Sequence, residues 1–413
     1  MAMKNLKILF LTFFLFAASV NTGYPQDRNV YWVHGFNGDA TAWQHYATIF
    51  TNERKINSIR LSYNTTSGLS TAASQLSASV NSTASTNMAI GHSMGGVMIR
   101  EVDRTASPKK FGGYVTFASP NYGAPISNSI LSGAVNSAAT TAINNINAGP
   151  IAELFGLPWL IITNWTTSIF VDKLFNSITY LNSSTNNDLK EGSTAMNNLN
   201  NYNSTAQRIS VIAQENSPVH WRFAATSAGM TETSMINVVN QVRGVYNDKY
   251  WFHENLRVAC LVALNLPGAA LHDNLAKQWK KGRDWIDDSE TIWCSLIKTS
   301  RLEPYTYSVV EWVPCPQINP KIPPQPDCGE WKPVYYTGTQ TVNYPSDGLI
   351  PTYAQELKGV SGGDRYTIEY ANHMELKNMS SSTLPNGNPN DGTRIKLTAI
   401  FNRSGWFNTP IRP

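Results

Sequence analysis

A serine between two glycines limits the possible folds of this chain more than any other feature. Ser93 lies in the run Gly-His-Ser-Met-Gly at residues 91–95. The apolar residues 87–90 before it predict the end of a buried strand, and residues 97–102 after it have the apolar and polar faces of a helix. Glycines two positions before and after the serine let neighbouring elements approach a sharp turn. This pattern is typical of a nucleophile elbow, in which the turn raises the serine hydroxyl into solvent.

A second glycine turn follows an earlier apolar run. Residues 29–33 predict a strand, and the sequence His-Gly-Phe-Asn-Gly-Asp at 34–39 ends it. Backbone N–H groups in such a turn can stabilise the negative oxygen of an acyl-transfer transition state without reorganising. The N–H groups of Phe36 and Met94 are our candidates for this oxyanion hole. We interpret His34 as a packing residue beneath the loop, because the donors required there are backbone groups.

Strand and helix patterns alternate from residue 24 to residue 124. The predicted strands are residues 29–33, 57–63, 88–91 and 113–117, and the predicted helices are residues 69–82 and 97–105. Such alternation predicts half of a doubly wound, mostly parallel sheet. The length of 413 residues exceeds the size at which one core stops growing, so we expect insertions or a second domain.

These segments resemble those of the secreted lipases and esterases of the α/β-hydrolase fold, which carry His-Gly-Phe before the first helix and Gly-His-Ser-Met-Gly-Gly at the elbow. A third match, Phe-Ala-Ser-Pro-Asn-Tyr-Gly-Ala-Pro at residues 117–125, is similar to the Thr-Pro-His-x-Gly-Ser segment of that family. The resemblance implies the fold class α/β, with a doubly wound, mostly parallel sheet of the α/β-hydrolase type and a helical cap. The residues that follow the cap predict a second insertion, which contains the cysteines.

The family's chain order of serine, acid and histidine implies that the other two catalytic residues follow Ser93. Asp347, beside a glycine and an apolar turn, resembles the acid of the family, which holds an imidazole in one tautomer. Asp364 is the rival, but it precedes a predicted strand at 365–370 instead of following one. His373 is the only one of the seven histidines beyond Asp347, and imidazole can both take and return a proton between about pH 5 and 8.

The motifs and the gaps between them divide the chain into six expected parts. They are a signal peptide at residues 1–22, the first part of the hydrolase core at 23–125, a cap or lid at 126–194, a return to the core at 195–214, the cysteine-bearing insertion at 215–336, and the last part of the core at 337–413. The cap contains apolar stretches at 143–155 and 157–181. These stretches could line an acyl pocket or make transient contact with a lipid surface. Burial in a small helical subdomain is the alternative.

The first residues predict export. Lys4 and Lys7 precede an apolar run at residues 8–18, and small residues follow where a signal peptidase could cut. The run is shorter than the roughly 20 residues that a membrane-spanning helix needs. We therefore expect a secreted or periplasmic protein without a transmembrane segment.

Four cysteines, Cys260, Cys294, Cys315 and Cys328, lie in the second insertion, away from the candidate catalytic residues. In an exported protein they predict two disulfides. Three pairings are possible, and the least demanding joins Cys260 with Cys294 and Cys315 with Cys328. The spacings contain no Cys-x-x-Cys pair, so a zinc site is disfavoured.

Composition argues against several other classes of function. With 32 basic and 28 acidic residues the net charge is +4, which does not indicate a nucleic-acid partner. The sequence has no glycine loop for phosphates and no histidine cluster with metal spacing, so we expect no cofactor and no metal. Asp287 and Asp288 are adjacent carboxylates for which a solvated helix face is favoured over calcium binding.

Taken with the resemblance, the sequence predicts a secreted serine hydrolase that cleaves carboxylic esters, lipids above all, through an acyl-enzyme on Ser93. Two other interpretations stay open. A lipid acyltransferase or a polyester depolymerase would use the same three residues with a different acceptor or cap. The second interpretation is a non-catalytic binding module, because a hydrolase fold does not guarantee an activity.

Overall fold

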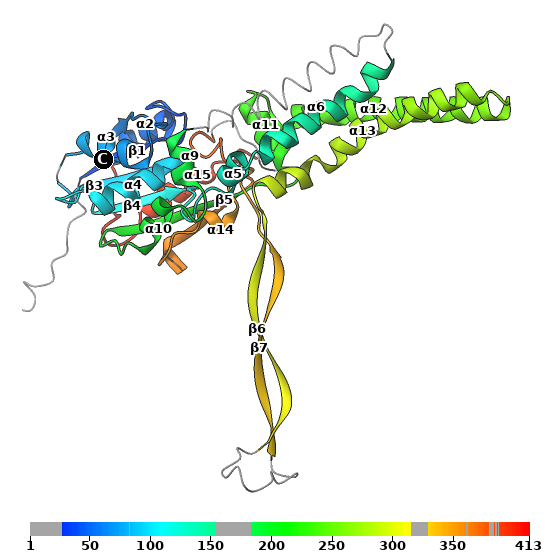
Figure 1. Cartoon of the computed structure of the whole chain (residues 1–413). Helices are drawn as coiled ribbons and strands as arrows, with labels where there is room; N and C mark the ends of the chain where they lie inside the picture. The colour runs from blue at the N-terminus through cyan, green and yellow to red at the C-terminus, as the bar shows by residue number, and fades with distance from the viewer. Residues whose placement is uncertain are drawn as a thin grey trace, which may run out of the picture.

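A six-stranded sheet forms the centre of the structure (Figure 1). The computed structural model describes residues 27–81, 83–153, 183–314, 329–360, 362–379 and 388–413, together with Leu384 and Asn386. The strands of the sheet are β1 (Arg28–Val33), β2 (Ile56–Leu61), β3 (Asn87–His92), β4 (Gly113–Phe117), β5 (Gln207–Gln214) and β8 (Arg365–Glu369). Their order in space is β2-β1-β3-β4-β5-β8, and every neighbouring pair is parallel. The predicted mostly parallel α/β sheet is therefore confirmed.

Helices cover both faces of this sheet and also form excursions from it (Figure 1). The helices are α2 (Gln44–Glu53), α3 (Leu69–Ala78), α4 (Met94–Thr105), α5 (Pro125–Leu131), α6 (Ala134–Glu153), α9 (Ser184–Leu189), α10 (Thr194–Asn201), α11 (Val219–Ser227), α12 (Glu232–Val262), α13 (Leu266–Leu296), α14 (Thr352–Gln355), α15 (Gly392–Phe401) and the 3-10 turn η2 (Gly362–Asp364). Two further strands, β6 (Ser300–Pro314) and β7 (Gly329–Asn343), pair only with each other within the part of the chain that the structure describes.

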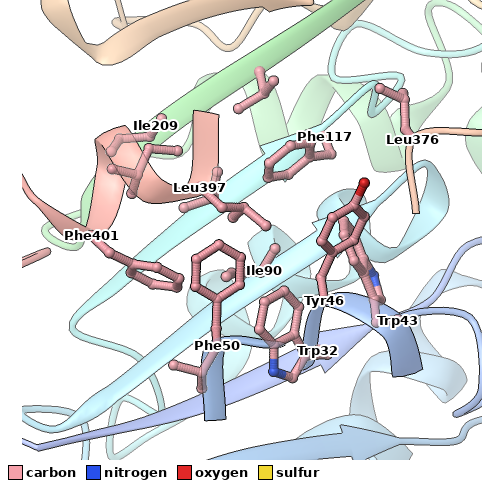
Figure 2. Packing of buried hydrophobic residues seen from close by; sticks show 14 of the residues in the cluster. Trp32, Trp43, Tyr46, Phe50, Ile90, Phe117, Ile209, Leu376, Leu397 and Phe401 are labelled. Atoms are coloured by element: carbon pink, nitrogen blue, oxygen red, sulfur yellow. The ribbon is translucent and has the colours of Figure 1, made fainter. Parts of the chain in front are cut away.

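Side chains of each strand alternate between two apolar cores. Trp32 of β1 points to the face that α2 and α15 cover, whereas its neighbour Tyr31 points to the face that α3 and α4 cover. Figure 2 shows the first of these cores, in which Trp32, Phe50 and Phe401 come together from β1, α2 and α15. Burying one such side chain stabilises the fold by about 1.5–3 kcal/mol. The two cores together hold the sheet rigid beneath the loops at its carboxyl edge.

The sheet order reverses direction between β1 and β3. The chain passes from β1 to β2 on one side, and then crosses to β3 and continues outward on the other side through β4, β5 and β8. At such a reversal the loops that leave the carboxyl ends of the two strands diverge and leave a crevice between them. The loop at residues 34–38 and the turn at Ser93 meet at this place.

The helices α12 and α13 form a long antiparallel hairpin that projects from the body, and α6 packs beside the half of the hairpin nearer the body (Figure 1). Tyr246 of α12 packs on Trp279 of α13 with ring centroids 5.1 Å apart. The Tyr246 hydroxyl donates a hydrogen bond of 2.6 Å to the carbonyl of Ile146 in α6. Gly282 of α13 faces the Tyr246 ring, where a Cβ atom would lie 2.2 Å from a ring carbon. This close approach joins the three helices.

The strands β6 and β7 form a second arm, which leaves the body in a different direction (Figure 1). They are antiparallel and stay in register from Ser300 opposite Asn343 to Pro314 opposite Gly329. Apart from the length of the insertion at 215–336 and its cysteines, no sequence feature indicated either arm.

The predicted disulfide between Cys260 and Cys294 is wrong. Both cysteines are free. Cys260 lies in the last turn of α12, at the tip of the hairpin, while Cys294 lies in the last turn of α13, at its base. At 1.5 Å of rise per residue, the length of α13 separates these two levels by roughly 40 Å, far beyond the reach of a disulfide. Cys315 and Cys328 lie outside the described residues, so their pairing stays a prediction.

The signal peptide at 1–22 and the whole of the second apolar stretch of the cap, 157–181, also lie outside the described residues. Within the first stretch, 143–155, residues 143–153 form the end of α6, and the last two residues lie outside the described part of the chain. Among the helices that the structure describes, none combines the length and the apolar character required to cross a bilayer.

Gly282 gives a test of the hairpin packing. We expect Gly282→Ala to destabilise the protein by about 1–3 kcal/mol, because the added methyl group must displace the buried Tyr246 ring. Gly244, in α12 of the same hairpin, has open space around its Cβ position, and Gly244→Ala is the matched control. Thermal unfolding followed by circular dichroism measures both, and equal effects would show that the close approach is not a constraint.

Candidate active site

Ser93 stands at the predicted sharp turn between β3 and α4. Its backbone has φ 56° and ψ −130°, a conformation that L-residues avoid. A Cβ atom on Gly91 would lie 2.5 Å from the backbone of Gly95, and a Cβ atom on Gly95 would lie 2.5 Å from the carbonyl oxygen of His34. Only glycine fits at these two positions. The close packing of the turn holds the serine in its strained conformation.

His373 joins Ser93 to Asp347 through its two ring nitrogens. Its Nε2 lies 2.8 Å from Ser93 Oγ, and its Nδ1 lies 2.7 Å from Asp347 Oδ2. Asp347 is 0% exposed and His373 is 2% exposed, whereas Ser93 is partly exposed. A carboxylate only accepts hydrogen bonds, so Nδ1 carries the proton and the Nε2 lone pair faces the serine hydroxyl. The three residues predicted from sequence are thus brought together in the order that proton transfer requires.

The Asp347 carboxylate is fixed by the turn in which it lies. Its Oδ1 accepts hydrogen bonds from the backbone N–H groups of Leu349 at 3.0 Å and Ile350 at 2.7 Å. Gly348 has φ +91°, which a side chain would strain, and its carbonyl accepts a 2.7 Å hydrogen bond from the indole of Trp293. The second oxygen of the carboxylate is thereby left for the histidine.

Asp364, the rival acid, lies away from these residues. It ends η2 at the start of β8 and pairs with the guanidinium of Arg403. His373 follows the opposite, carboxyl end of the same strand. Because parallel strands all present their carboxyl ends at one edge of the sheet, Asp364 is at the wrong edge to orient His373.

His92 is a positioning residue that the sequence reasoning missed. Its Nε2 lies 2.8 Å from the backbone carbonyl oxygen of His373, and its ring lies beside the His373 ring with centroids 4.7 Å apart. Burial holds the pKa of His92 well below its ordinary value. The neutral ring therefore donates from Nε2 and fixes the backbone of the His373 loop. Its place directly before Ser93 in the elbow was the available signal.

The two candidate oxyanion donors flank the serine. Met94 is the first residue of α4. The N–H groups at the start of a helix have no acceptor within the helix, because no helical turn precedes them. A Cβ atom on Gly35 would lie 2.8 Å from Ser93 Cβ, which places the loop of Phe36 against the nucleophile. His34 is buried and stacks on Tyr63 with ring centroids 4.5 Å apart, in agreement with its interpretation as a packing residue. The role of the two N–H groups stays a prediction.

A cluster of three carboxylates lies next to the loops that carry Asp347 and His373. Oxygens of Glu215, Glu232 and Glu375 lie within 4.8 Å of one another. The Arg222 guanidinium pairs with Glu232 and lies 4.0 Å from Glu215, so the cluster already has a cation. Burial and the facing Glu232 raise the pKa of Glu215 well above its ordinary value. The side chain of Asn372, next to His373, donates to Glu232 at 3.4 Å, which connects the cluster to the histidine loop.

Comparisons with known proteins add little to this geometry. No model of a known protein family matches the chain, and no curated protein matches it. Among solved structures, an epoxide hydrolase of Bacillus megaterium in complex with an inhibitor is similar over 42% of this chain, with 11% sequence identity and a TM-score of 0.21. The chain spans 64% of the length of that structure. A likeness at this level assigns neither a reaction nor a substrate.

The positioning role of His92 has a kinetic signature. We expect His92→Leu to lower kcat by about 10–100-fold with little change in KM, because a small displacement of His373 impairs proton transfer but not binding. His92→Gln, whose amide can still donate to the His373 carbonyl, is expected to recover much of the rate. Failure of glutamine to improve on leucine would assign His92 a packing role only.

The carboxylate cluster predicts a pH-dependent stability. Because the pKa of Glu215 is raised to about 8, the folded protein binds more protons than the unfolded chain between about pH 4 and about pH 8. Stability therefore falls as pH rises through this window, and the loss is complete above it. Glu215→Gln imitates the protonated carboxyl group and removes this loss. We expect the variant to gain Tm over the wild type progressively from about pH 4 to about pH 8 and to keep a constant gain above it, with Glu369→Gln, at an exposed position, as control. A constant difference in Tm across pH would contradict this account.

Proposed function

We propose that this protein is an exported serine hydrolase that cleaves carboxylic esters, lipid esters in particular, with Ser93 as its nucleophile. The observation that carries the proposal is the pair of hydrogen bonds on His373, 2.8 Å to Ser93 Oγ and 2.7 Å to Asp347 Oδ2. A buried carboxylate, a buried imidazole and a partly exposed hydroxyl in this order are the arrangement that activates a serine for acyl transfer. The apolar leader at residues 1–22 supports export, to the periplasm or beyond.

In the first half-reaction, Ser93 Oγ forms a bond to the ester carbonyl carbon while its proton passes to His373 Nε2. The imidazolium that results is stabilised by Asp347, which stays ionised. The carbonyl oxygen takes the negative charge, and the N–H groups of Phe36 and Met94 are the proposed donors to it. Collapse of the tetrahedral intermediate breaks the bond to the alcohol oxygen, which leaves with the proton from His373. The product of this step is an acyl-enzyme on Ser93.

In the second half-reaction, water attacks the acyl-enzyme and gives its proton to His373 Nε2. The same oxyanion donors stabilise the second tetrahedral intermediate. When it collapses, the carboxylic acid leaves and the proton returns from His373 to Ser93 Oγ. One imidazole thus moves every proton in the cycle, because both of its nitrogens are held in place.

Ester hydrolysis by the chain without residues 1–22 tests this proposal. On p-nitrophenyl esters from acetate to palmitate, we expect Ser93→Ala to lose about 10⁴-fold or more in kcat/KM while its Tm is preserved. Ser70→Ala, at an exposed position of α3, is the matched control and is expected to keep the wild-type rate. The acyl length that reacts fastest distinguishes a lipase from an esterase.

Two results would contradict the proposal. A Ser93→Ala variant that retains a large fraction of the wild-type rate would exclude Ser93 as the nucleophile. A folded wild-type protein that is inactive on every ester would favour the binding module. An added alcohol that captures the acyl group in preference to water would instead identify an acyltransferase that uses the same residues.

A further inference from the structure

The end of the helical hairpin is apolar and exposed. Residues 258–271, which include the end of α12, the turn and the start of α13, contain no charged side chain. We call this segment the apolar tip. Its large exposed apolar side chains are Val258, Leu261, Val262, Leu264, Leu266 and Leu271. Leu264 is 85% exposed and Val262 is 81% exposed, so the apolar surface is offered to solvent at the farthest point of the hairpin from the body (Figure 1).

The apolar tip ends at the same level on both helices. Arg257 lies seven residues before Leu264, and His272 lies seven residues after Asn265, at the other end of the turn. With a rise of 1.5 Å per residue, both boundaries lie about 10 Å below the turn. The charged side chains nearest this level are paired within each helix, Arg257 with Glu254 and Asp273 with Lys277 one turn further from the tip. The boundary between apolar and polar residues thus lies at equal height on both helices and carries little net charge. Such a boundary fits a flat interface between an apolar layer and water.

Several backbone N–H groups of the turn have hydrogen-bond partners within the chain. The N–H groups of Ala263, Leu264 and Asn265 donate to the carbonyls of Ala259, Leu261 and Cys260 at 3.0, 3.1 and 2.8 Å. The Asn265 side chain accepts from the N–H of Gly268 at 3.1 Å and so caps the start of α13. An unsatisfied backbone group is what normally excludes a loop from hydrocarbon, because it costs several kcal/mol there. This turn largely avoids that cost.

Leu264 contradicts the local rules of folding. Its φ is +55°, a region in which glycine, asparagine and aspartate are favoured and leucine is strained. Its side chain also gains no burial, since it is almost fully exposed. Neither the backbone conformation nor contact with water favours leucine at position 264. An interaction with a partner outside the folded chain therefore explains its presence better than the stability of the fold does.

We propose that the apolar tip inserts into the surface of a lipid bilayer and attaches the protein to it. A second copy of the chain is the other possible occupant, but a stable protein interface uses about 20–30 residues on each side, and the apolar tip offers six large apolar side chains. Insertion at the interface needs only a small apolar group with polar residues at its border. The proposal does not depend on the ester hydrolase activity, because it rests on the hairpin alone.

Flotation with vesicles of phosphatidylcholine tests the proposal. The protein and its variants lack residues 1–22, so that the apolar leader does not contribute to binding. We expect the wild type to float with the vesicles, and Leu264→Asp combined with Leu266→Asp to reduce the bound fraction about tenfold or more. The positive φ of Leu264 tolerates aspartate, so the fold is preserved. Leu302→Asp in β6, where the leucine is 72% exposed, is the matched control and is expected to float like the wild type.

Salt and oligomeric state distinguish the other occupants. Since the charges at the border of the apolar tip are paired, we expect binding to be nearly unchanged at about 0.5 M salt, at which charge attraction is screened. A wild type that does not float, or a tip variant that floats equally well, overturns the proposal. A wild-type dimer in size-exclusion chromatography that the tip variant converts to a monomer would show that the apolar tip binds a second copy instead.

Discussion

The two hydrogen bonds of His373 are the constraint on which the rest of the structure depends. They join residues that are 280 and 26 positions apart in the chain, and two of the three side chains are buried. A buried carboxylate is tolerated only when its charge is matched by donors. The sheet order supplies the geometry, because it brings the end of β3 and the end of β8 to one edge. The glycines at the elbow then let Ser93 approach that edge.

The large insertion is compatible with this site because its ends are tied together. The N–H of Glu215, directly after β5, donates to the carbonyl of Ser346, directly before Asp347, at 2.8 Å. The acid thus returns to the end of β5 after an excursion of about 130 residues. The base of the hairpin also contacts the site through the indole of Trp293 at Gly348. The insertion therefore supports the acid turn, although its arms extend into solvent.

Local sequence signals were sufficient for the parts of the fold that local interactions determine. The strands β1 to β4 begin and end within two residues of the predicted positions, and the elbow, the acid turn and the histidine loop lie where their motifs indicated. The helices α3 and α4 differ from the prediction by three or four residues at one end. Glycine turns and apolar alternation are properties of neighbouring residues, which explains this agreement.

Contacts between distant residues could not be predicted in the same way. The pairing of Cys260 with Cys294 assumed that cysteines close in sequence are close in space, but an antiparallel hairpin places them at opposite ends. The part played by His92 depends on a carbonyl 281 residues away. Within the described part of the chain, β6 and β7 pair only with each other. Their register depends on backbone hydrogen bonds, which the composition of the insertion does not predict.

The central claim is that Ser93 is an activated nucleophile, and mass spectrometry after treatment with a fluorophosphonate tests it most directly. The phosphonate phosphorus reacts with a serine oxygen only where a base removes the proton, so a single adduct is expected, on the peptide that contains Ser93. Because His373 is this base and Asp347 holds it in place, the adduct is expected to form far more slowly in His373→Ala. A folded protein that gains no adduct, or gains it on another serine, would contradict the account.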